Sequence, residues 1–477
     1  MAKDVTYQRA DYEEARILWD EISDVLAGEK SVKAKGDVYL PRPNPTDTSK
    51  ENQARYKNYV MRAVFYNATN RTVTGSVGSA FRKAPMIEVP ESIDYLIDDV
   101  DGCGVSLVQQ SKSTSKSVLA KGRSALLVDY PQTGGEASKA QMQQNGIRVN
   151  IIRLKPEQVI NWRTETIGGI QKLVLVVIHE KREEVGADGF SVESIDRYRV
   201  LRLTEGVYTQ EFHEKINDSW MIVEGPFVVT DGSGLAFDEI PIIFPGSVNN
   251  DAEIDFAPAY DLASLNLAHY RNSADYEDSA YLVGQPQIWM AGLTQEWLEM
   301  IKERGLYLGS RAPLPLPVDG AAGMLQAEAN GMIKEAMDQK ETQMIALGAR
   351  LIQPGSSVKT ATEAQGEQET EHSVLSMVCD NVSQAYQQAL EWAARFAGVR
   401  AADGGIVFEI NQDFVKVALS PQMLTALIAA WQSGKLPSSD LWDQLRRYGV
   451  IDPEKTDDEI KDELEGEGAG LGLGDEE

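Results

Sequence analysis

The first 130 residues combine helical apolar periodicity with one short apolar run. Apolar residues recur at helical spacing over 12–26 and again over 51–81, where Val64 falls near the apolar face. Residues 92–122 carry two more helical patterns, broken at the sequence DGCG. The run RSALLVDY (123–130) is typical of a buried strand. This part of the chain is therefore predicted to be helical with one strand.

The pattern changes between residues 148 and 245. Short β-branched runs such as KLVLVVIHE and DRYRVLRLTEG follow one another, and turn signals separate them. The sequences GADGF (186–190) and TEGV (204–207) have the composition of hairpin turns. We therefore expect a β-rich module of about a hundred residues here.

Two long helical patterns follow, with a mixed insert between them. Residues 261–282 contain no Pro or Gly and predict one helix, and 332–352 carries an apolar stripe close to a heptad. The segment between them contains a short helical pattern, 295–304, and a Pro-rich stretch. The first long helix is polar on most sides, so we expect that neighbouring elements stabilise it or that it lines a water-filled space. Its polar residues are Asn266, His269, Arg271, Asn272, Asp275, Glu277 and Asp278.

The best periodic signal of the chain comes next. Thr360 and Glu363 fit a capping box, which predicts a helix from residue 361 to 397. A strand is expected in GIVFEI (405–410), followed by two helical pieces within 420–448.

The charge of the chain limits its partners. The 477 residues include 42% hydrophobic ones, enough for a sizeable core, and 46 basic against 73 acidic residues give a net charge of −27. General nucleic-acid binding is excluded, because that affinity comes from Lys and Arg neutralising phosphates, although local contact with DNA is not. The tail 452–477 has 12 acidic and 2 basic residues and is expected to be solvated and mobile.

Cysteine use and hydropathy favour a protein that is soluble and intracellular when made. Cys103 and Cys379 make neither a disulfide framework nor a metal site, which fits a reducing compartment. The charged N-terminus lacks the apolar core of a signal peptide. The longest purely apolar run, 173–178, is too short to cross a membrane.

One stretch, LIQPGSSVKTATEAQ (351–365), has the small, polar and basic character of a phosphate-binding loop. A P-loop requires Gly directly before its Lys and another Gly five residues earlier. Here Val358 precedes Lys359, and Gln353 occupies the earlier position. No apolar strand leads into the stretch, so a polar connection between two helices is the favoured interpretation.

No enzyme signature, cofactor site or metal site is found in the sequence. None of the four His has a second His or Cys at ligand spacing. His179 and His213 are expected to be surface residues, and the acidic run before His372 fits a solvated helix face. Carboxylates are abundant, but abundance alone cannot identify a catalytic pair.

The order of these elements resembles that of tailed-bacteriophage portal proteins. Four motifs in the same order strengthen the resemblance to a phage and prophage portal family once labelled only as a domain of unknown function. Together they cover about residues 50–450. The motifs are VFYNATNRTVTGSVGSAFRKAPMIEVP (64–90), VLAKGRSALLVDYP (118–131), DLASLNLAHYRNSADYEDSAYLVGQPQI (261–288) and ALGARLI with KTATEA (346–364).

The resemblance implies an α+β portal-like fold that assembles into a ring, typically a dodecamer, at one capsid vertex. It divides the chain as follows: a wing of N-terminal helices and β-rich module (1–257), two stem helices (258–283 and 331–352), a mixed α/β clip (284–330), a tunnel loop (353–360), a long wing helix (361–398), a C-terminal wing or small crown (399–451) and the acidic tail (452–477).

The resemblance also implies a function and partners. A portal ring conducts double-stranded DNA during packaging and ejection, and it contacts the large terminase, the major capsid or scaffolding protein and head-tail adaptor proteins. Such a ring is part of the virion. It is assembled in the host cytoplasm and has no membrane partner. The residues expected at the DNA channel are Gln353, Gly355, Ser356, Ser357 and Lys359. Those expected at the motor or adaptor contact are Trp297, Leu298, Met300 and Ile301, although packing against a neighbouring subunit explains that face equally well.

Two other functions stay open at this point. One is an acidic structural or adaptor protein of the virion that never conducts DNA. The other is an ATP-driven packaging enzyme, which the missing P-loop disfavours.

Overall fold

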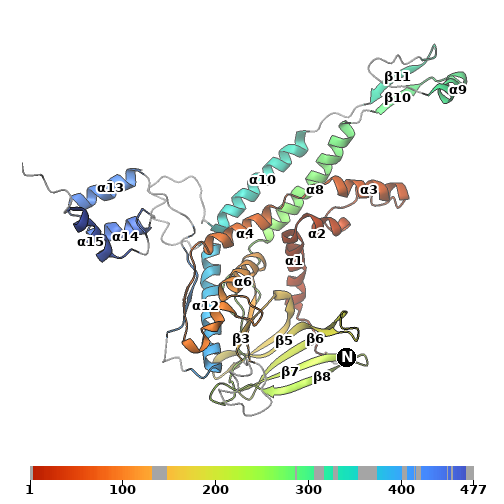
Figure 1. Cartoon of the computed structure of the whole chain (residues 1–477). Helices are drawn as coiled ribbons and strands as arrows, with labels where there is room; N and C mark the ends of the chain where they lie inside the picture. The colour runs from red at the N-terminus through yellow and green to blue at the C-terminus, as the bar shows by residue number, and fades with distance from the viewer. Residues whose placement is uncertain are drawn as a thin grey trace, which may run out of the picture. The chain divides into compact units, whose positions relative to one another are not determined.

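The computed structural model describes most of the chain in two compact units, Met1–Gln412 and Asp413–Glu477. Figure 1 draws the chain from the N-terminus in red to the C-terminus in blue. The described residues are 4–130, 148–284, 287–305, 316–325, 331–352, 373–399, 405–412, 414, 421–447, 450–452 and 455–468.

The N-terminal helices are α1 (Ala10–Ala27), α2 (Glu29–Ala34), α3 (Lys50–Arg62) and α4 (Ala68–Ala80). The expectation of one helical pattern over 51–81 is corrected, because residues 63–67 form a non-helical link. Asn67 ends this link and caps α4 by accepting a hydrogen bond from the Asn70 backbone N–H. Val64, which periodicity placed on an apolar helix face, lies in the link and is 49% exposed.

A glycine fixes the junction between α6 (Leu107–Lys121) and the strand that follows. Gly122 has a φ of 76° at the C-cap, and a Cβ there would lie 2.2 Å from the Phe256 carbonyl oxygen. The predicted strand is confirmed as β2 (Ala125–Asp129), which is central in a three-stranded sheet of order β3-β2-β9. Its partners are β3 (Asn150–Leu154) and β9 (Ile242–Ile243).

The predicted β-rich module is a five-stranded antiparallel sheet. The strands pair in chain order, β4-β5-β6-β7-β8, so each connection is a hairpin. Both sequences predicted as hairpin turns lie at such connections, GADGF between β5 and β6 and TEGV between β6 and β7. The strands are β4 (Val159–Ile167), β5 (Ile170–Val185), β6 (Val192–Thr204), β7 (Val207–Ile216) and β8 (Ser219–Val228).

Two long helices, α8 (Tyr260–Val283) and α10 (Gly331–Ile352), pack side by side (Figure 1). They confirm the two helical patterns predicted on either side of an insert. Between them lie the strands β10 (Gln287–Ala291) and β11 (Ala321–Leu325), which pair antiparallel, and the helix α9 (Gln295–Arg304). We refer to β10, α9 and β11 as the insert module.

The helix predicted over 361–397 is not one continuous helix, because α12 begins after Ser373. Ser373 has an extended backbone, with φ −67° and ψ 154°, and its hydroxyl caps α12 (Val374–Phe396) by accepting from the Ser376 N–H. The proposed capping box at Thr360 and Glu363 lies outside the described residues. The strand predicted in 405–410 is confirmed as β12 (Val407–Glu409), which pairs with β1 (Met86–Glu88).

The second unit contains α13 (Pro421–Gln432), α14 (Ser438–Arg447) and α15 (Asp457–Gly468). The expectation of a mobile, solvated tail from residue 452 is corrected for α15, where Ile460 is only 7% exposed. Thr456 and Glu459 bond each other's backbone N–H at the start of this helix, and Asp457 forms an ion pair with Arg446. Acidic residues in a first turn also favour the positive end of the helix dipole.

Candidate functional site

The polar side of α8 is buried against the rest of the first unit. Asn266, His269 and Ser273 are 0%, 3% and 2% exposed. They are spaced at i, i+3 and i+7, so they form one face of the helix. This polar face is therefore stabilised by neighbouring elements and does not line a water-filled space, which were the two expectations for this helix.

Asn266 uses its whole amide group in this contact. Its Oδ1 accepts from the backbone N–H of Thr69 at 3.2 Å and from the Thr69 hydroxyl at 3.0 Å. Its Nδ2 donates to the carbonyl oxygen of Tyr66 at 2.7 Å. The side chain thus satisfies backbone groups where α4 begins. Without it the buried Thr69 N–H would lose its acceptor, whereas the Tyr66 carbonyl oxygen also accepts from the Ala68 N–H at 2.8 Å.

Further along α8, the same kind of contact continues to α3. The Ser273 hydroxyl accepts from the Val64 N–H at 3.0 Å. The Tyr59 hydroxyl donates to Asp275 at 2.6 Å, and burial together with this carboxylate raises the pKa of Tyr59. Arg62 forms an ion pair with Asp278. The link 63–67 and the end of α3 are therefore fastened to α8 by polar side chains.

The C-terminal half of α10 is packed closely against its neighbours. His269 Nε2 of α8 lies 3.2 Å from Glu341 Oε1 of α10. Farther along, Met344 and Leu351 are 3% and 7% exposed, and a Cβ at Gly348 would lie 3.0 Å from the Thr72 side chain. The C-terminal half of α10 is thus held against α4 and α8.

The other halves of the two helices expose large apolar side chains. Tyr276, Tyr281 and Leu282 of α8 are 38%, 46% and 53% exposed, and Met332 of α10 is 72% exposed. Buried apolar residues of α8 are confined to its first part, up to Ala274. The helix pair is therefore anchored at one end. It leaves apolar surface uncovered at the other end, and also at Ile345 of α10, which is 74% exposed; such surface is typical of an interaction surface.

The four residues predicted for partner contact lie on α9 of the insert module, but they differ in exposure. Trp297 is only 7% exposed, so it packs within the chain, whereas Leu298 is 45% exposed. Met300 and Ile301 are half-buried. The geometry leaves Leu298 as the most accessible apolar residue of the four.

The five residues predicted for the DNA channel, Gln353, Gly355, Ser356, Ser357 and Lys359, lie outside the described residues. The structure describes both flanks of their segment. It follows the end of α10 at Ile352 and precedes the cap of α12 at Ser373.

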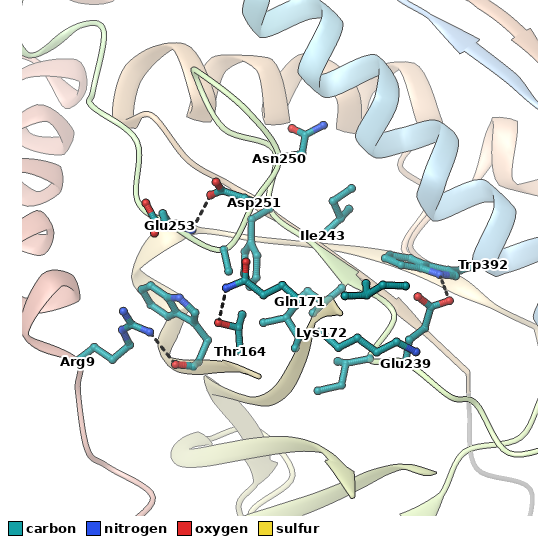
Figure 2. Close-up of a pocket in the computed structure, with 17 residues that line it drawn as sticks. Arg9, Thr164, Gln171, Lys172, Glu239, Ile243, Asn250, Asp251, Glu253 and Trp392 are labelled. Atoms are coloured by element: carbon teal, nitrogen blue, oxygen red, sulfur yellow. Dashed lines mark hydrogen bonds between the residues drawn. The ribbon is translucent and has the colours of Figure 1, made fainter. Parts of the chain in front are cut away.

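A cavity of about 390 Å³ lies where β4, β5, the loop 239–253 and α12 meet. Figure 2 shows that its polar side chains bond one another or the nearby backbone. Trp392 Nε1 donates to Glu239 at 2.9 Å, Gln171 donates to Thr164 at 3.0 Å, and Arg9 donates to the Trp162 carbonyl oxygen at 2.9 Å. Because these groups already have partners, we regard the cavity as a junction between elements rather than a ligand site.

The histidines in the described residues form polar pairs. His179 lies 2.9 Å from Asp196, and His213 lies 3.2 Å from Glu211. The His213 side chain is only 14% exposed, so the expectation that it is a surface residue is corrected. Among the described residues, no group of His, Cys, Asp and Glu is arranged to hold a metal ion. No helix in the same part of the chain has the length and apolarity of a membrane span.

The helix pair and its attached segments coincide with a family model. Residues 258–397, which contain α8, the insert module, α10 and α12, match a domain of unknown function (DUF4055). This is less than half of the 477 residues. No curated protein matches the sequence.

Similar chains occur in solved structures of gene transfer agent (GTA) particles. One, from the virion of the native particle, has 14% identity and a TM-score of 0.41, with 88% of this chain and 97% of that chain covered. A second, from the neck of the native particle computed with C12 symmetry, has 13% identity and a TM-score of 0.41, with 87% and 98% covered. A third, from the neck of the empty particle computed with C6 symmetry, has 14% identity, the same TM-score and the same coverage. A TM-score of 0.41 is too low to carry an argument about function.

Proposed function

We propose that the chain is the subunit of a portal-like ring that conducts double-stranded DNA at one vertex of a virion. The observation that carries the proposal is the α8–α10 pair, anchored at one end and apolar at the other. Large exposed apolar surfaces on a single chain mark contact with other molecules, and a ring supplies them as neighbouring copies. The number of copies we propose is twelve.

In this proposal α8 and α10 are the stem, and the insert module is the clip. Residues 1–257 and the helix that contains α12 supply the wing, and 399–451 is the C-terminal wing or small crown. The segment 353–360 is the tunnel loop that faces the DNA. Because α10 runs about 33 Å from Gly331 to Ile352, it separates the clip from the tunnel loop along the channel.

The charge of the chain fits a conduit that does not grip its cargo. At −27 for each copy, a ring carries a strong negative field that disfavours tight phosphate contact. DNA that is held by many Lys and Arg residues would stall during translocation. A sparsely basic lining, with Lys359 as one of its few cations, allows contact without capture.

The test is ring formation combined with a change at Lys359. Native mass spectrometry and negative-stain imaging of the purified chain should show closed rings, and Lys359→Glu should form the same rings while DNA packaging falls severalfold. Lys181→Glu, at an exposed position of β5 in the wing, is the matched charge reversal and should package normally. A monomer, an open filament, or unchanged packaging by Lys359→Glu would count against the proposal. Robust nucleotide hydrolysis by the isolated protein would instead support a packaging enzyme.

A second prediction concerns the clip and its proposed partners, the large terminase and the adaptor proteins. Leu298→Asp should leave the ring intact and weaken partner binding at least tenfold, because it places a charge at an exposed apolar contact. Trp297→Ala should instead destabilise the insert module by about 3–5 kcal/mol, since that side chain is buried. Pull-down of the terminase and proteolysis of the clip distinguish the two effects. Equal partner binding by Leu298→Asp and the unmodified chain would exclude Leu298 as a contact.

A further inference from the structure

One part of this acidic chain is strongly basic. Residues 50–83 contain seven basic residues and only one acidic residue, Glu51, and α6 contains three basic residues and no acidic one. The basic residues of both segments are Lys50, Arg55, Lys57, Arg62, Arg71, Arg82, Lys83, Lys112, Lys116 and Lys121. Two of these charges are neutralised, because Arg62 pairs with Asp278 and Lys121 pairs with Glu157.

Three of the remaining cations lie on α4 and α6, which pack against each other. Lys116 Nζ lies 3.1 Å from Asn70 Oδ1 and 3.3 Å from the Thr74 hydroxyl, so it bridges the two helices. Lys112 lies over the ring of Phe81, with 5.6 Å between Nζ and the ring centroid. Arg71 is exposed, and its guanidinium lies 5.7 Å from the Tyr66 ring centroid. We refer to Arg71, Lys112 and Lys116 as the basic platform.

Packing on the opposite face of α6 fixes the direction of its lysines. The Tyr386 hydroxyl of α12 lies 3.0 Å from Gln110 Oε1 and 2.9 Å from the Thr114 hydroxyl, and all three side chains are buried. Lys112 and Lys116 are each two positions beyond one of these buried residues, and residues two apart on a helix do not share a face. The two lysines are therefore turned away from the core.

The cations of the basic platform form no ion pair with a carboxylate in the part of the chain that the structure describes. Arg62 and Lys121 nearby, by contrast, have such partners. Another molecule can also approach α4 closely beside the platform, because a Cβ at Gly75 or Gly78 would meet nothing within 4 Å.

The chemistry of this surface favours a nucleic-acid backbone over a protein partner. None of the large apolar side chains found exposed in the described residues belongs to α4 or α6. Protein interfaces are enriched in aromatic residues and Met at their centre, whereas interfaces with DNA are polar and positively charged. Exposed hydroxyl and amide groups, such as Thr74, Ser113 and Gln109, are the usual neutral partners of phosphate and sugar oxygens.

We propose that the basic platform binds the sugar–phosphate backbone of double-stranded DNA without reading its sequence. Three cations give weak and salt-sensitive binding rather than a tight grip. Lys112 and Lys116 lie one helical turn apart, so they can contact successive parts of one strand while Arg71 contacts the duplex from α4. The inference does not rest on the proposed conduit, because binding is a property of the isolated chain without ring or motor.

The test measures binding of the full-length protein to a labelled DNA duplex of roughly 24 base pairs by fluorescence anisotropy, at salt concentrations from about 50 to 200 mM. The unmodified protein should bind with an affinity that falls as salt rises. The triple variant Arg71→Glu, Lys112→Glu, Lys116→Glu should bind at least about tenfold more weakly, and the slope of log affinity against log salt should fall by about 3. The neutral triple variant with Gln at the same positions should lower the slope equally with a smaller loss of affinity.

A matched control carries the same change of net charge at exposed lysines elsewhere. Lys30→Glu, Lys181→Glu and Lys302→Glu together should retain DNA binding within about threefold of the unmodified protein, because unpaired distant charges are screened. Salt-independent binding by the unmodified protein, or equal losses in the platform and control triple variants, would overturn the proposal. If the platform triple variant keeps DNA binding but loses self-association in native mass spectrometry, the platform instead binds an acidic face of a second copy.

Discussion

Asn266→Ala should lower the free energy of unfolding of the first unit by about 2–4 kcal/mol, because it removes three hydrogen bonds from a fully buried site. The loss goes beyond the bonds themselves. The Thr69 N–H stays buried without an acceptor after the substitution, and water cannot replace the missing amide without opening the contact between α4 and α8.

Denaturant unfolding of the full chain, followed by circular dichroism, measures this effect. Asn272→Ala is the matched control, since it removes the same side chain from a less buried position of the same helix, and it should change stability by less than about 1 kcal/mol. Hydrogen exchange adds a local readout, because amides of 63–72 should lose protection before those of the five-stranded sheet. If Asn266→Ala and Asn272→Ala unfold alike, the amide network does not anchor α8.

Arg199→Met should destabilise the first unit by about 3–5 kcal/mol at neutral pH. The Arg199 side chain of β6 is 11% exposed and lies 2.7 Å from Asp129 of β2 and 2.9 Å from Glu180 of β5. Burial lowers the pKa of Arg199, but these two carboxylates outweigh burial and raise it. Its removal leaves both carboxylates, which are largely buried, without their cation.

A variant that also neutralises the two carboxylates separates the effect of unpaired charge from the effect of lost packing. Adding Asp129→Asn and Glu180→Gln to Arg199→Met removes the uncompensated charges and should restore part of the lost stability. Arg163→Met is the control on the same sheet, because its ion pair with Glu165 is 63% and 54% exposed and should contribute less than about 1 kcal/mol. If the compensated variant is as unstable as Arg199→Met, packing of the arginine stem rather than charge decides the effect.

Periodicity predicted most of the elements because their apolar faces are packed on a core. The two helices around an insert, the strand after Gly122, and the hairpin turns GADGF and TEGV were all recognised from local pattern. Local pattern failed where polar caps decide the boundary. Asn67 starts a new helix inside an apparently continuous pattern, and Ser373 starts α12 inside the pattern read as one helix over 361–397.

The candidate site was predictable only in part, because burial of a polar residue depends on partners that are distant in sequence. Trp297 and Leu298 looked equivalent as adjacent apolar residues, yet one is buried and the other exposed. The channel residues around Lys359 fall outside the described residues, so their role stays a prediction. The sequence could have indicated the buried polar face of α8, since Asn266, His269 and Ser273 recur at the spacing of one helix face.

The sequence by itself determined the order of helices and strands, the strongly negative charge and the absence of a P-loop at Lys359. These features depend on residue type and short-range spacing alone. Only the tertiary structure decided that α8 is anchored by buried polar side chains, and that Lys112 and Lys116 of α6 lie against Phe81 and Asn70. Such contacts join segments far apart in the chain, and no local pattern specifies which partner satisfies a buried polar group or leaves a cation unpaired.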